Sequence, residues 1–285
     1  MKTVFLRLLI LTLVPFTAKS SEVIPYYGHD FNQSKAQLKN DELKNKLKEI
    51  LKSGHVIASP QTEDQLVKSC DSIPNCSMQT SLGYDRARIY LFGEFYLVQD
   101  AQGYGVQEMY CDRVYTAADF KGGLGAPAPG TIPEGTVINT EHTWPQSRFT
   151  GKYSADLQKA DMHHLFPTDS QMNSLRGSSM FGEVIKPSNK TKCTASKYGQ
   201  GDGTTQKVFE PPQRHKGHVA RALMYFSIRY DLPISQAEEV MLKKWNLQNP
   251  PDQQEILRNN MIQQKQGNRN PFIDYPELAD QILDF

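Results

Sequence analysis

Three residues near the middle of the chain carry side chains that together could hydrolyse a phosphate ester. Glu141 and His142 are adjacent, and Asn173 follows further along the chain. A carboxylate and an amide oxygen are hard ligands that suit Mg²⁺ or Ca²⁺ and bind Zn²⁺ poorly. Two protein ligands leave positions for water and a phosphate oxygen, which is how Mg²⁺ usually binds. A neutral imidazole beside such a cation can remove a proton from water.

The elements that must position these residues form a compact unit over about 136–177. Residues 136–142 and 163–167 are predicted as short extended segments on either side of a polar loop. Thr168 and Gln171 form a possible capping box, which predicts a helix that carries Asn173. Adjacent strand residues point to opposite faces, so Glu141 and His142 can share a site only at a strand end or a bulge.

The flanking segments predict further helices and strands. An amphipathic helix is expected over 34–53, opened by a capping box at Ser34 and Gln37 and ended by Gly54. One face of that helix carries Leu43, Leu47, Ile50 and Leu51.

Later segments complete an α+β pattern. Residues 88–98 and 105–115 are rich in β-branched and aromatic residues, which favours two strands joined by a turn near 100–103. Gly and Pro make 122–135 a surface loop. No segment clearly separates two cores, so we expect one mixed α+β domain with a small antiparallel sheet. Further helices are predicted over 217–230, 235–245 and 253–266.

The first twenty residues are typical of a secretory signal peptide. Lys2 and Arg7 precede a short apolar run, and small residues stand at Ala18 and Ser20. We therefore expect cleavage near Ser20, a mature domain over 21–285 and a product that is secreted or periplasmic. The whole chain has 32 basic and 31 acidic residues, and loss of three leader cations leaves a slight negative excess. Global charge thus gives no support to a nucleic-acid partner.

Four cysteines in an exported chain predict disulfide bonds. Three pairings are possible. Cys70 and Cys76 flank a plausible small loop, so we favour Cys70–Cys76 together with Cys111–Cys193. The spacing does not fit a zinc knuckle.

Positive charge is concentrated between Lys186 and Arg229, where nine basic residues accompany two acidic ones. Lys190, Lys192 and Lys197 could bind the backbone of a nucleic acid through phosphate contacts. A solvated basic face is the alternative interpretation.

The motifs around Glu141 resemble those of the bacterial endonuclease I family. The resemblance lies in Asn-Thr-Glu-His-Thr-Trp-Pro over 139–145, Asp-Met-His-His-Leu-Phe-Pro-Thr over 161–168 and Gln-Met-Asn-Ser over 171–174. Matching segments before and after them extend it over nearly the whole mature chain. The resemblance implies a secreted or periplasmic nuclease with a ββα-metal finger, also called a His-Me finger.

The resemblance also implies roles for individual residues. His142 matches the general base, and Glu141 and Asn173 match the metal ligands. Asp161, His163 and His164 match supporting positions of the motif. The family also uses an arginine near the scissile phosphate, and Arg148 and Arg176 are the candidates for it.

The resemblance implies Mg²⁺, or Ca²⁺ or Mn²⁺, and hydrolysis of DNA and RNA with little sequence preference and 5′-phosphate ends. We expect a monomer without membrane attachment. Two alternatives remain: a nuclease of the same fold restricted to RNA, and an exported binding module without catalysis.

Overall fold

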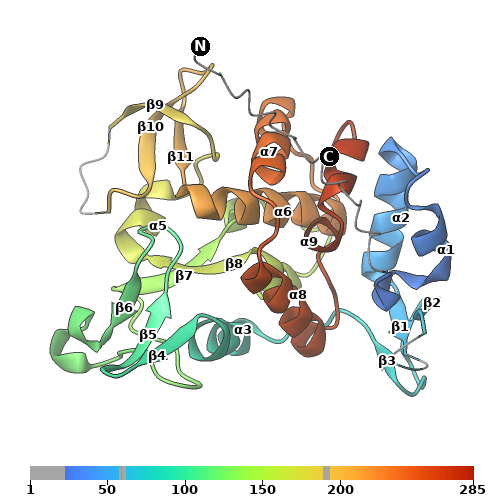
Figure 1. Cartoon of the computed structure of the whole chain (residues 1–285), viewed down its shortest axis with the longest axis horizontal. Helices are drawn as coiled ribbons and strands as arrows, with labels where there is room; N and C mark the ends of the chain where they lie inside the picture. Colours follow the sequence, from blue (N-terminus) through green and yellow to red (C-terminus); the bar gives the residue numbers. More distant parts are fainter. Residues whose placement is uncertain (1–22, 58, 60–61, 189–192) are drawn as a thin grey trace, which may run out of the picture.

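Helix α6 (Gln213–Tyr230) runs through the middle of the molecule, and every residue from His215 to Tyr230 is buried. The computed structural model describes residues 23–57, 59, 62–188 and 193–285. Helices α2 (Asn40–Lys52) and α7 (Gln236–Gln248) pack against α6, and α8 (Gln253–Gln266) lies beside it (Figure 1). Residues of α6 belong to both apolar clusters of the core, so this helix joins them.

The three predicted C-terminal helices are confirmed. The helix predicted over 217–230 begins earlier, at Gln213, directly after Pro212. Pro212 lacks a backbone N–H and is therefore well tolerated at a helix start. The helices predicted over 235–245 and 253–266 correspond to α7 and α8. Short α9 (Pro271–Asp274) and a 3₁₀ segment (Pro276–Gln281) follow.

The predicted helix over 34–53 is correct only from Asn40 onward. Helix α1 (Gly28–Ser34) ends where the predicted helix began, and the capping box is not formed. Instead, the Ser34 hydroxyl donates to the Asp30 carbonyl at 2.7 Å. The predicted apolar face of α2 is confirmed, since all four of its residues are buried. A small sheet follows, made of β1 (Gly54–Val56), β2 (Gln65–Val67) and β3 (Cys76–Ser77).

The strand predicted over 88–98 is wrong for most of its length. Helix α3 (Tyr84–Tyr90) continues into a π-helical turn (Leu91–Phe95) before β4 (Leu97–Asp100) begins. Ala87, Leu91 and Phe92 are buried at helical spacing, so packing of one helical face outweighs the β-favouring composition. The predicted turn near 100–103 is confirmed, because β4 pairs with β5 (Gly103–Gln107) across it.

The predicted second strand breaks in two. Strand β5 ends at Gln107, and β6 (Val114–Thr116) pairs with it after an irregular segment. The loop predicted over 122–135 contains no strand or α-helix, and only the end of a 3₁₀ turn (Lys121–Gly123) falls within it. Another 3₁₀ turn (Ala117–Asp119) precedes it.

The predicted strand–loop–strand–helix unit is present. Strand β7 (Ile138–His142) pairs antiparallel with β8 (Leu165–Asp169), and α5 (Ser170–Arg176) follows β8 directly. The loop between the strands contains a 3₁₀ turn (Gln146–Arg148), helix α4 (Ala155–Lys159) and another 3₁₀ turn (Met162–His164). The N-cap of α5 is Asp169 and not Thr168, because the Asp169 carboxylate accepts from the Met172 amide at 2.8 Å.

A third peripheral sheet and two disulfides complete the structure. Strands β9 (Val184–Pro187), β10 (Lys197–Gly201) and β11 (Lys207–Glu210) form a sheet beside α6 (Figure 1). Within the described ranges every pairing between named strands is antiparallel, which confirms the α+β fold class. The favoured cysteine pairing is also confirmed: Cys70 bonds to Cys76, and Cys111 bonds to Cys193. The helices in the described part of the chain are too short or too polar to cross a bilayer.

Candidate active site

A cavity of about 250 Å³ opens where β7 ends beside the C-terminal half of α5. Glu141, His142 and Asn173 all line it, together with Gln146 and Arg176. Glu141 and His142 are the last two residues of β7. The expectation that a strand end brings both side chains to one site therefore agrees with the geometry.

Glu141 is only 2 % exposed and is oriented by a buried arginine. The Arg176 guanidinium donates from Nη1 to Glu141 Oε1 at 2.7 Å. Arg176 also donates to the backbone carbonyls of His142 and Thr143, at 3.0 and 2.8 Å. Burial raises the pKa of Glu141 to about 7, against the opposing effects of the Arg176 charge and the Tyr110 hydroxyl. A further positive charge in the cavity would favour the ionised carboxylate.

The hydrogen bonds of His142 fix which ring nitrogen carries the proton. Nε2 lies 3.1 Å from the Lys159 carbonyl oxygen, which can only accept, so Nε2 is the protonated nitrogen. Nδ1 then keeps its lone pair, and the Gln146 amide nitrogen lies 3.3 Å from it. Burial lowers the pKa of His142 to about 4, so the ring is neutral at pH 7. A neutral ring is thereby held with the lone pair of Nδ1 on the side of the cavity residue Gln146.

Asn173 is held with its side-chain oxygen free. Its Nδ2 donates to Asn139 Oδ1 at 2.7 Å and to the Thr140 carbonyl at 3.2 Å. Both partners are acceptors, so the nitrogen must be the atom that faces them. No donor within the described ranges hydrogen-bonds to Asn173 Oδ1, and this oxygen belongs to a cavity-lining residue.

These donors fit a hard divalent cation. One carboxylate and one amide oxygen line a polar cavity large enough for water and a phosphate oxygen, which is the chemistry that Mg²⁺ prefers. Among the residues that the structure describes, no group of three or more His, Cys, Asp or Glu side chains could hold a metal. The described residues therefore do not form a site in which such side chains alone surround the cation.

Asp161 lies outside the cavity, in a saturated network beneath α6. Its carboxylate is 1 % exposed and accepts five hydrogen bonds. Although burial alone would raise the pKa of Asp161, nearby histidines and these hydrogen bonds hold it below its usual value. The five donors are the His163 backbone amide, the side-chain amides of Gln79 and Gln266, and the hydroxyls of Tyr225 and Tyr230.

His163 and His164 are packed into the same interior region. Nε2 of His163 lies 3.2 Å from the Asn268 carbonyl, and Nε2 of His164 lies 2.9 Å from the Gln158 carbonyl. Burial lowers the pKa of both rings, to about 4 for His163. Neither lines the cavity, which favours the supporting role expected for them over direct catalysis.

The two candidate phosphate-binding arginines differ in accessibility. Arg176 is 2 % exposed and engages Glu141 and backbone carbonyls, so its geometry favours positioning of Glu141 over contact with a phosphate. Arg148 is partly exposed beside the cavity-lining Ser147, and it donates to the carbonyl of Ser178, another cavity residue, at 3.3 Å. Arg148 remains the accessible candidate.

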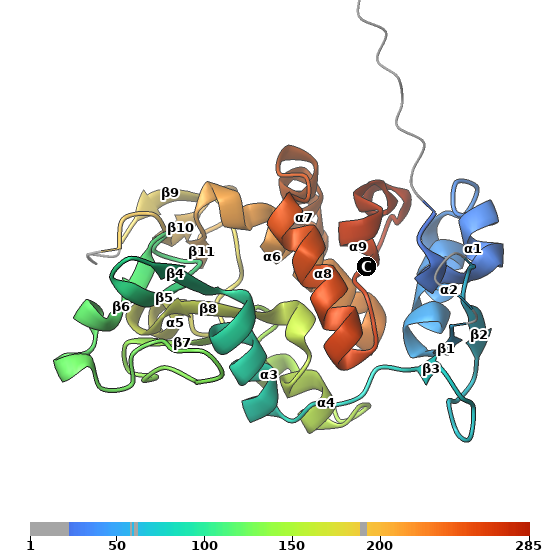
Figure 2. The same cartoon turned by 60° about the horizontal axis from the view of Figure 1, so that its bottom comes forward.

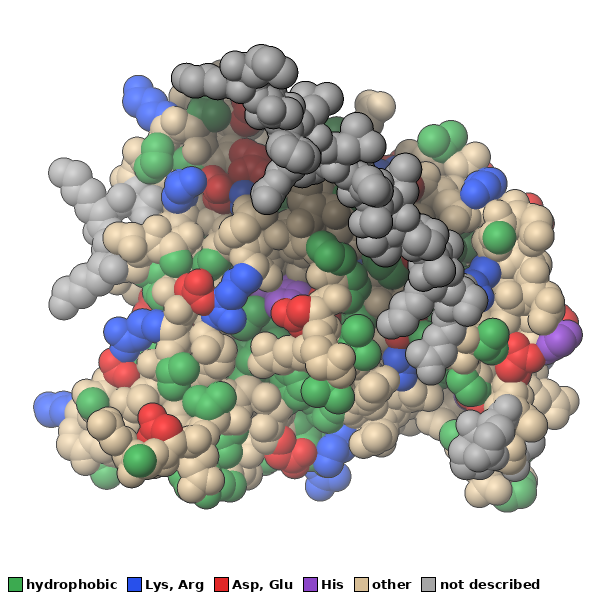
Figure 3. Space-filling view, viewed as in Figure 1, with side chains coloured by type: hydrophobic (Ala, Val, Ile, Leu, Met, Phe, Trp, Pro, Cys, Tyr) green, Lys and Arg blue, Asp and Glu red, His purple; other side chains and the backbone are tan. Residues whose placement is uncertain are grey.

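The described basic residues between Lys186 and Arg229 do not form a continuous surface. Lys216, Arg221 and Arg229 are buried, because α6 runs through the core. Lys197 is paired with Glu210 at 3.3 Å, and Lys190 and Lys192 lie outside the described residues. On the face shown in Figure 3, basic and acidic side chains are interspersed. The charge count in the sequence thus overstated the surface charge.

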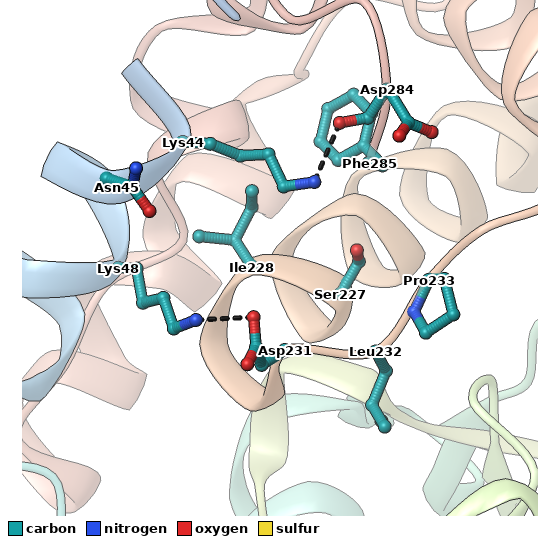
Figure 4. A pocket seen from close by; sticks show the side chains of 10 residues that line it. All are labelled: Lys44, Asn45, Lys48, Ser227, Ile228, Asp231, Leu232, Pro233, Asp284 and Phe285. Carbon is teal, nitrogen blue, oxygen red and sulfur yellow. Dashed lines mark hydrogen bonds and ion pairs between the residues drawn. The ribbon is translucent and has the colours of Figure 1, made fainter. Parts of the chain in front are cut away.

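A second cavity, of about 190 Å³, lies between α2 and the end of α6. Figure 4 shows Lys48 directed at Asp231 and Lys44 at the backbone oxygen of Asp284. Lys152 also pairs with Asp231. Because its lysines already have acceptors, this cavity offers little to an added anion.

Sequence reasoning missed the residues that hold the imidazole. Lys159 acts through its backbone carbonyl, which leaves no signature in the choice of side chain. Gln146 follows His142 closely in the sequence, so its polar side chain was an identifiable candidate neighbour of the imidazole. Asn139 belongs to the recognised motif, but its contact with Asn173 depends on the β7–α5 geometry.

Comparison with known proteins gives one family. Residues 40–277 match the family model described as Endonuclease I.

Several named relatives share parts of the sequence. An extracellular ribonuclease of Bacillus subtilis is 37 % identical over 168 residues, which is 50 % of this chain and 53 % of the relative. A periplasmic deoxyribonuclease of Aeromonas hydrophila is 34 % identical over 124 residues, covering 42 % and 51 % of the two chains. An endonuclease-1 of Buchnera aphidicola from Acyrthosiphon pisum is 27 % identical over 115 residues, covering 40 % and 44 %. The chain thus spans about half the length of the curated relatives it matches.

Proposed function

Given that the chain belongs to the endonuclease I family, we propose that it is an exported endonuclease that hydrolyses phosphodiester bonds of DNA and RNA with little sequence preference. The observation that carries this proposal is the gathering of three acceptor groups around one cavity. His142 Nδ1 and Asn173 Oδ1 line the same space as the Glu141 carboxylate. Relatives named as deoxyribonucleases and ribonucleases support both substrates.

Glu141 and Asn173 would hold the divalent cation, most simply Mg²⁺, with Mn²⁺ or Ca²⁺ as alternatives. Such a cation, when bound, supplies charge stabilisation to the phosphate and to the leaving oxygen. Arg176 fixes the Glu141 carboxylate from the interior side, and Asn139 fixes the orientation of the Asn173 amide. Both ligands are therefore preorganised.

His142 acts as the general base in this proposal. Nδ1 accepts a proton from a water molecule whose oxygen attacks phosphorus, while the bond from phosphorus to the 3′-oxygen breaks. The leaving 3′-oxygen takes a proton from solvent, and the 5′-phosphate end remains. The Lys159 carbonyl keeps Nε2 protonated and so keeps the lone pair on Nδ1, where it can accept the proton. The Gln146 amide nitrogen must yield its place beside Nδ1 to the water.

Export and oligomeric state are also part of the proposal. The leader expected over 1–20 lies outside the described residues, and relatives named extracellular or periplasmic support secretion. The two disulfides suit an oxidising compartment. We propose a monomer, which light scattering of the purified mature protein would test.

The direct test incubates purified protein with supercoiled plasmid and, separately, with a structured RNA, each with Mg²⁺ or with EDTA. Cleavage of both substrates that requires Mg²⁺ and leaves 5′-phosphate ends is expected. Cleavage of RNA alone would establish the RNA-restricted alternative. Binding of nucleic acid without any cleavage by the folded, oxidised protein would establish the binding module.

A further inference from the structure

The aromatic ring of Tyr84 lies against the candidate base. Tyr84 is the first residue of α3, and its ring centroid lies 5.3 Å from that of His142. The ring is partly exposed, so this side of the site remains open to a ligand. Figure 2 shows α3 and α4 side by side, and α4 ends at Lys159, whose carbonyl holds the imidazole.

Two cationic side chains gather on that ring. The Arg88 guanidinium carbon lies 5.3 Å from the centroid of Tyr84, and Lys159 Nζ lies 4.6 Å from it. The two cations come from different helices, α3 and α4, which are far apart in sequence. A shared aromatic ring holds both through cation–π attraction, and it does so without neutralising either charge.

The structure leaves both cations with unused capacity for an anion. Within the described residues Lys159 Nζ has no hydrogen-bond or ion-pair partner. Arg88 has an Asp85 oxygen at 3.5 Å, but that carboxylate is 83 % exposed, so the pair is weak. The Arg88 Nε is buried without a hydrogen-bond partner among the described residues. By contrast, Lys197 and Lys48 each have a carboxylate partner.

The position of these cations relates them to the cavity. The ring that both cations contact lies 5.3 Å from the His142 ring, and Lys159 also holds His142 through its carbonyl. The two positive charges are complementary to the nucleic-acid backbone, which carries a negatively charged phosphate at every nucleotide. Contacts to backbone phosphates carry no base preference, as expected for a sequence-tolerant nuclease.

We propose that Arg88 and Lys159, held together by Tyr84, bind a backbone phosphate of the nucleic-acid strand next to the phosphate that is cleaved. This inference rests on the proposed function. It replaces the segment around Lys190 to Lys197 as the first place to look for the strand. It also couples binding of the strand to the position of the general base. The side chain of Lys159 would bind the strand, while the Lys159 carbonyl orients His142.

The test measures binding of a fluorescent oligonucleotide in EDTA, so that no cleavage is needed for the readout. The proteins compared are wild type, Arg88→Gln, Lys159→Gln, the double variant and the exposed control Lys121→Gln. Glutamine keeps most of the side-chain length and leaves the Lys159 carbonyl in place. We expect the double variant to raise Kd about 10-fold and to lower the salt slope of binding by about one, with the control unchanged.

A Kd within twofold of wild type and an unchanged salt slope in the double variant would overturn the proposal. Melting temperatures and the charge-conserving pair Arg88→Lys and Lys159→Arg guard against misfolding, because these variants should retain binding. Plasmid cleavage by wild type separates the two claims. Cleavage with unaltered binding by the double variant rejects only this phosphate site, whereas weakened binding without wild-type cleavage rejects only the proposed reaction.

Discussion

One stretch of sequence, residues 139–174, supplies carboxylate and histidine side chains to two very different places. Glu141 and His142 line an open cavity and keep acceptor atoms directed into it. Asp161 and His163 lie in the interior, where five donors saturate the carboxylate of Asp161. Both carboxylates are almost fully buried, so burial alone does not separate them.

The difference lies in how many donors surround each acid. Nearby histidines and hydrogen bonds hold the pKa of Asp161 below its usual value, whereas Glu141 has few partners and burial raises its pKa to about 7. A saturated carboxylate stabilises the fold and has no capacity left for a ligand. An undersaturated one is costly to bury and is expected where a cation or substrate completes it. We call Glu141 and His142 the proposed reactive half of this stretch. Asp161 and His163 form its structural half.

The largest effect is expected from Glu141→Gln. Loss of the carboxylate should lower kcat/KM by about 10³-fold, because a bound cation contributes several kcal/mol of charge stabilisation. The Mg²⁺ concentration needed for half-maximal rate should rise in parallel. Rates measured across a Mg²⁺ titration check this, and wild-type activity in the variant would remove Glu141 from the site.

Asp161→Asn should act on stability instead. The new amide nitrogen would face N–H and O–H donors where the carboxylate oxygen accepted from them. The buried hydrogen bonds lost in this way should lower the free energy of unfolding by about 3 kcal/mol. Urea unfolding beside the exposed control Asp202→Asn measures this loss. Turnover per folded molecule should stay near wild type, and a selective loss of turnover would assign Asp161 to the chemistry.

The structural half should also make the protein acid-sensitive. Burial lowers the pKa of His163 from an ordinary 6.5 to about 4, so between these values only the unfolded chain binds the proton. Stability is therefore present above pH 6.5 and is lost as the pH falls. The loss between pH 7 and pH 5 should be about 2 kcal/mol smaller in His163→Gln. Parallel curves of unfolding free energy against pH for the two proteins would disprove this contribution.

The smallest effect is expected from Lys197→Ala. Lys197 is half-exposed and already paired with Glu210, so its removal should change unfolding free energy by less than about 0.5 kcal/mol. Its effect on binding should fall well below that of the Arg88 and Lys159 double variant. Oligonucleotide titrations at two salt concentrations compare the Kd values of the two variants. A larger effect from Lys197→Ala would indicate that the nucleic-acid strand binds beside β10 instead.

The sequence predicted the grouping of three polar side chains in one place more accurately than it predicted the surrounding elements. Glu141, His142 and Asn173 were identifiable because motif residues, a strand end and a following helix together limit where side chains can meet. The helical structure of residues 84–95 was not predicted. Their β-branched and aromatic composition is typical of a strand, but packing of one face against the core favours a helix. Surface charge also escaped prediction, since burial of Lys216, Arg221 and Arg229 depends on how α6 is covered.

The most direct test of the division between the two halves compares His142→Ala with His163→Gln at equal concentrations of folded protein. The initial rate of plasmid nicking with saturating Mg²⁺ is the measurement. His142→Ala should lose about 10²- to 10³-fold in rate per folded molecule, as expected for removal of a general base. His163→Gln should keep its rate and change only in stability. Equal rates for His142→Ala and wild type would contradict the central claim that His142 activates the attacking water.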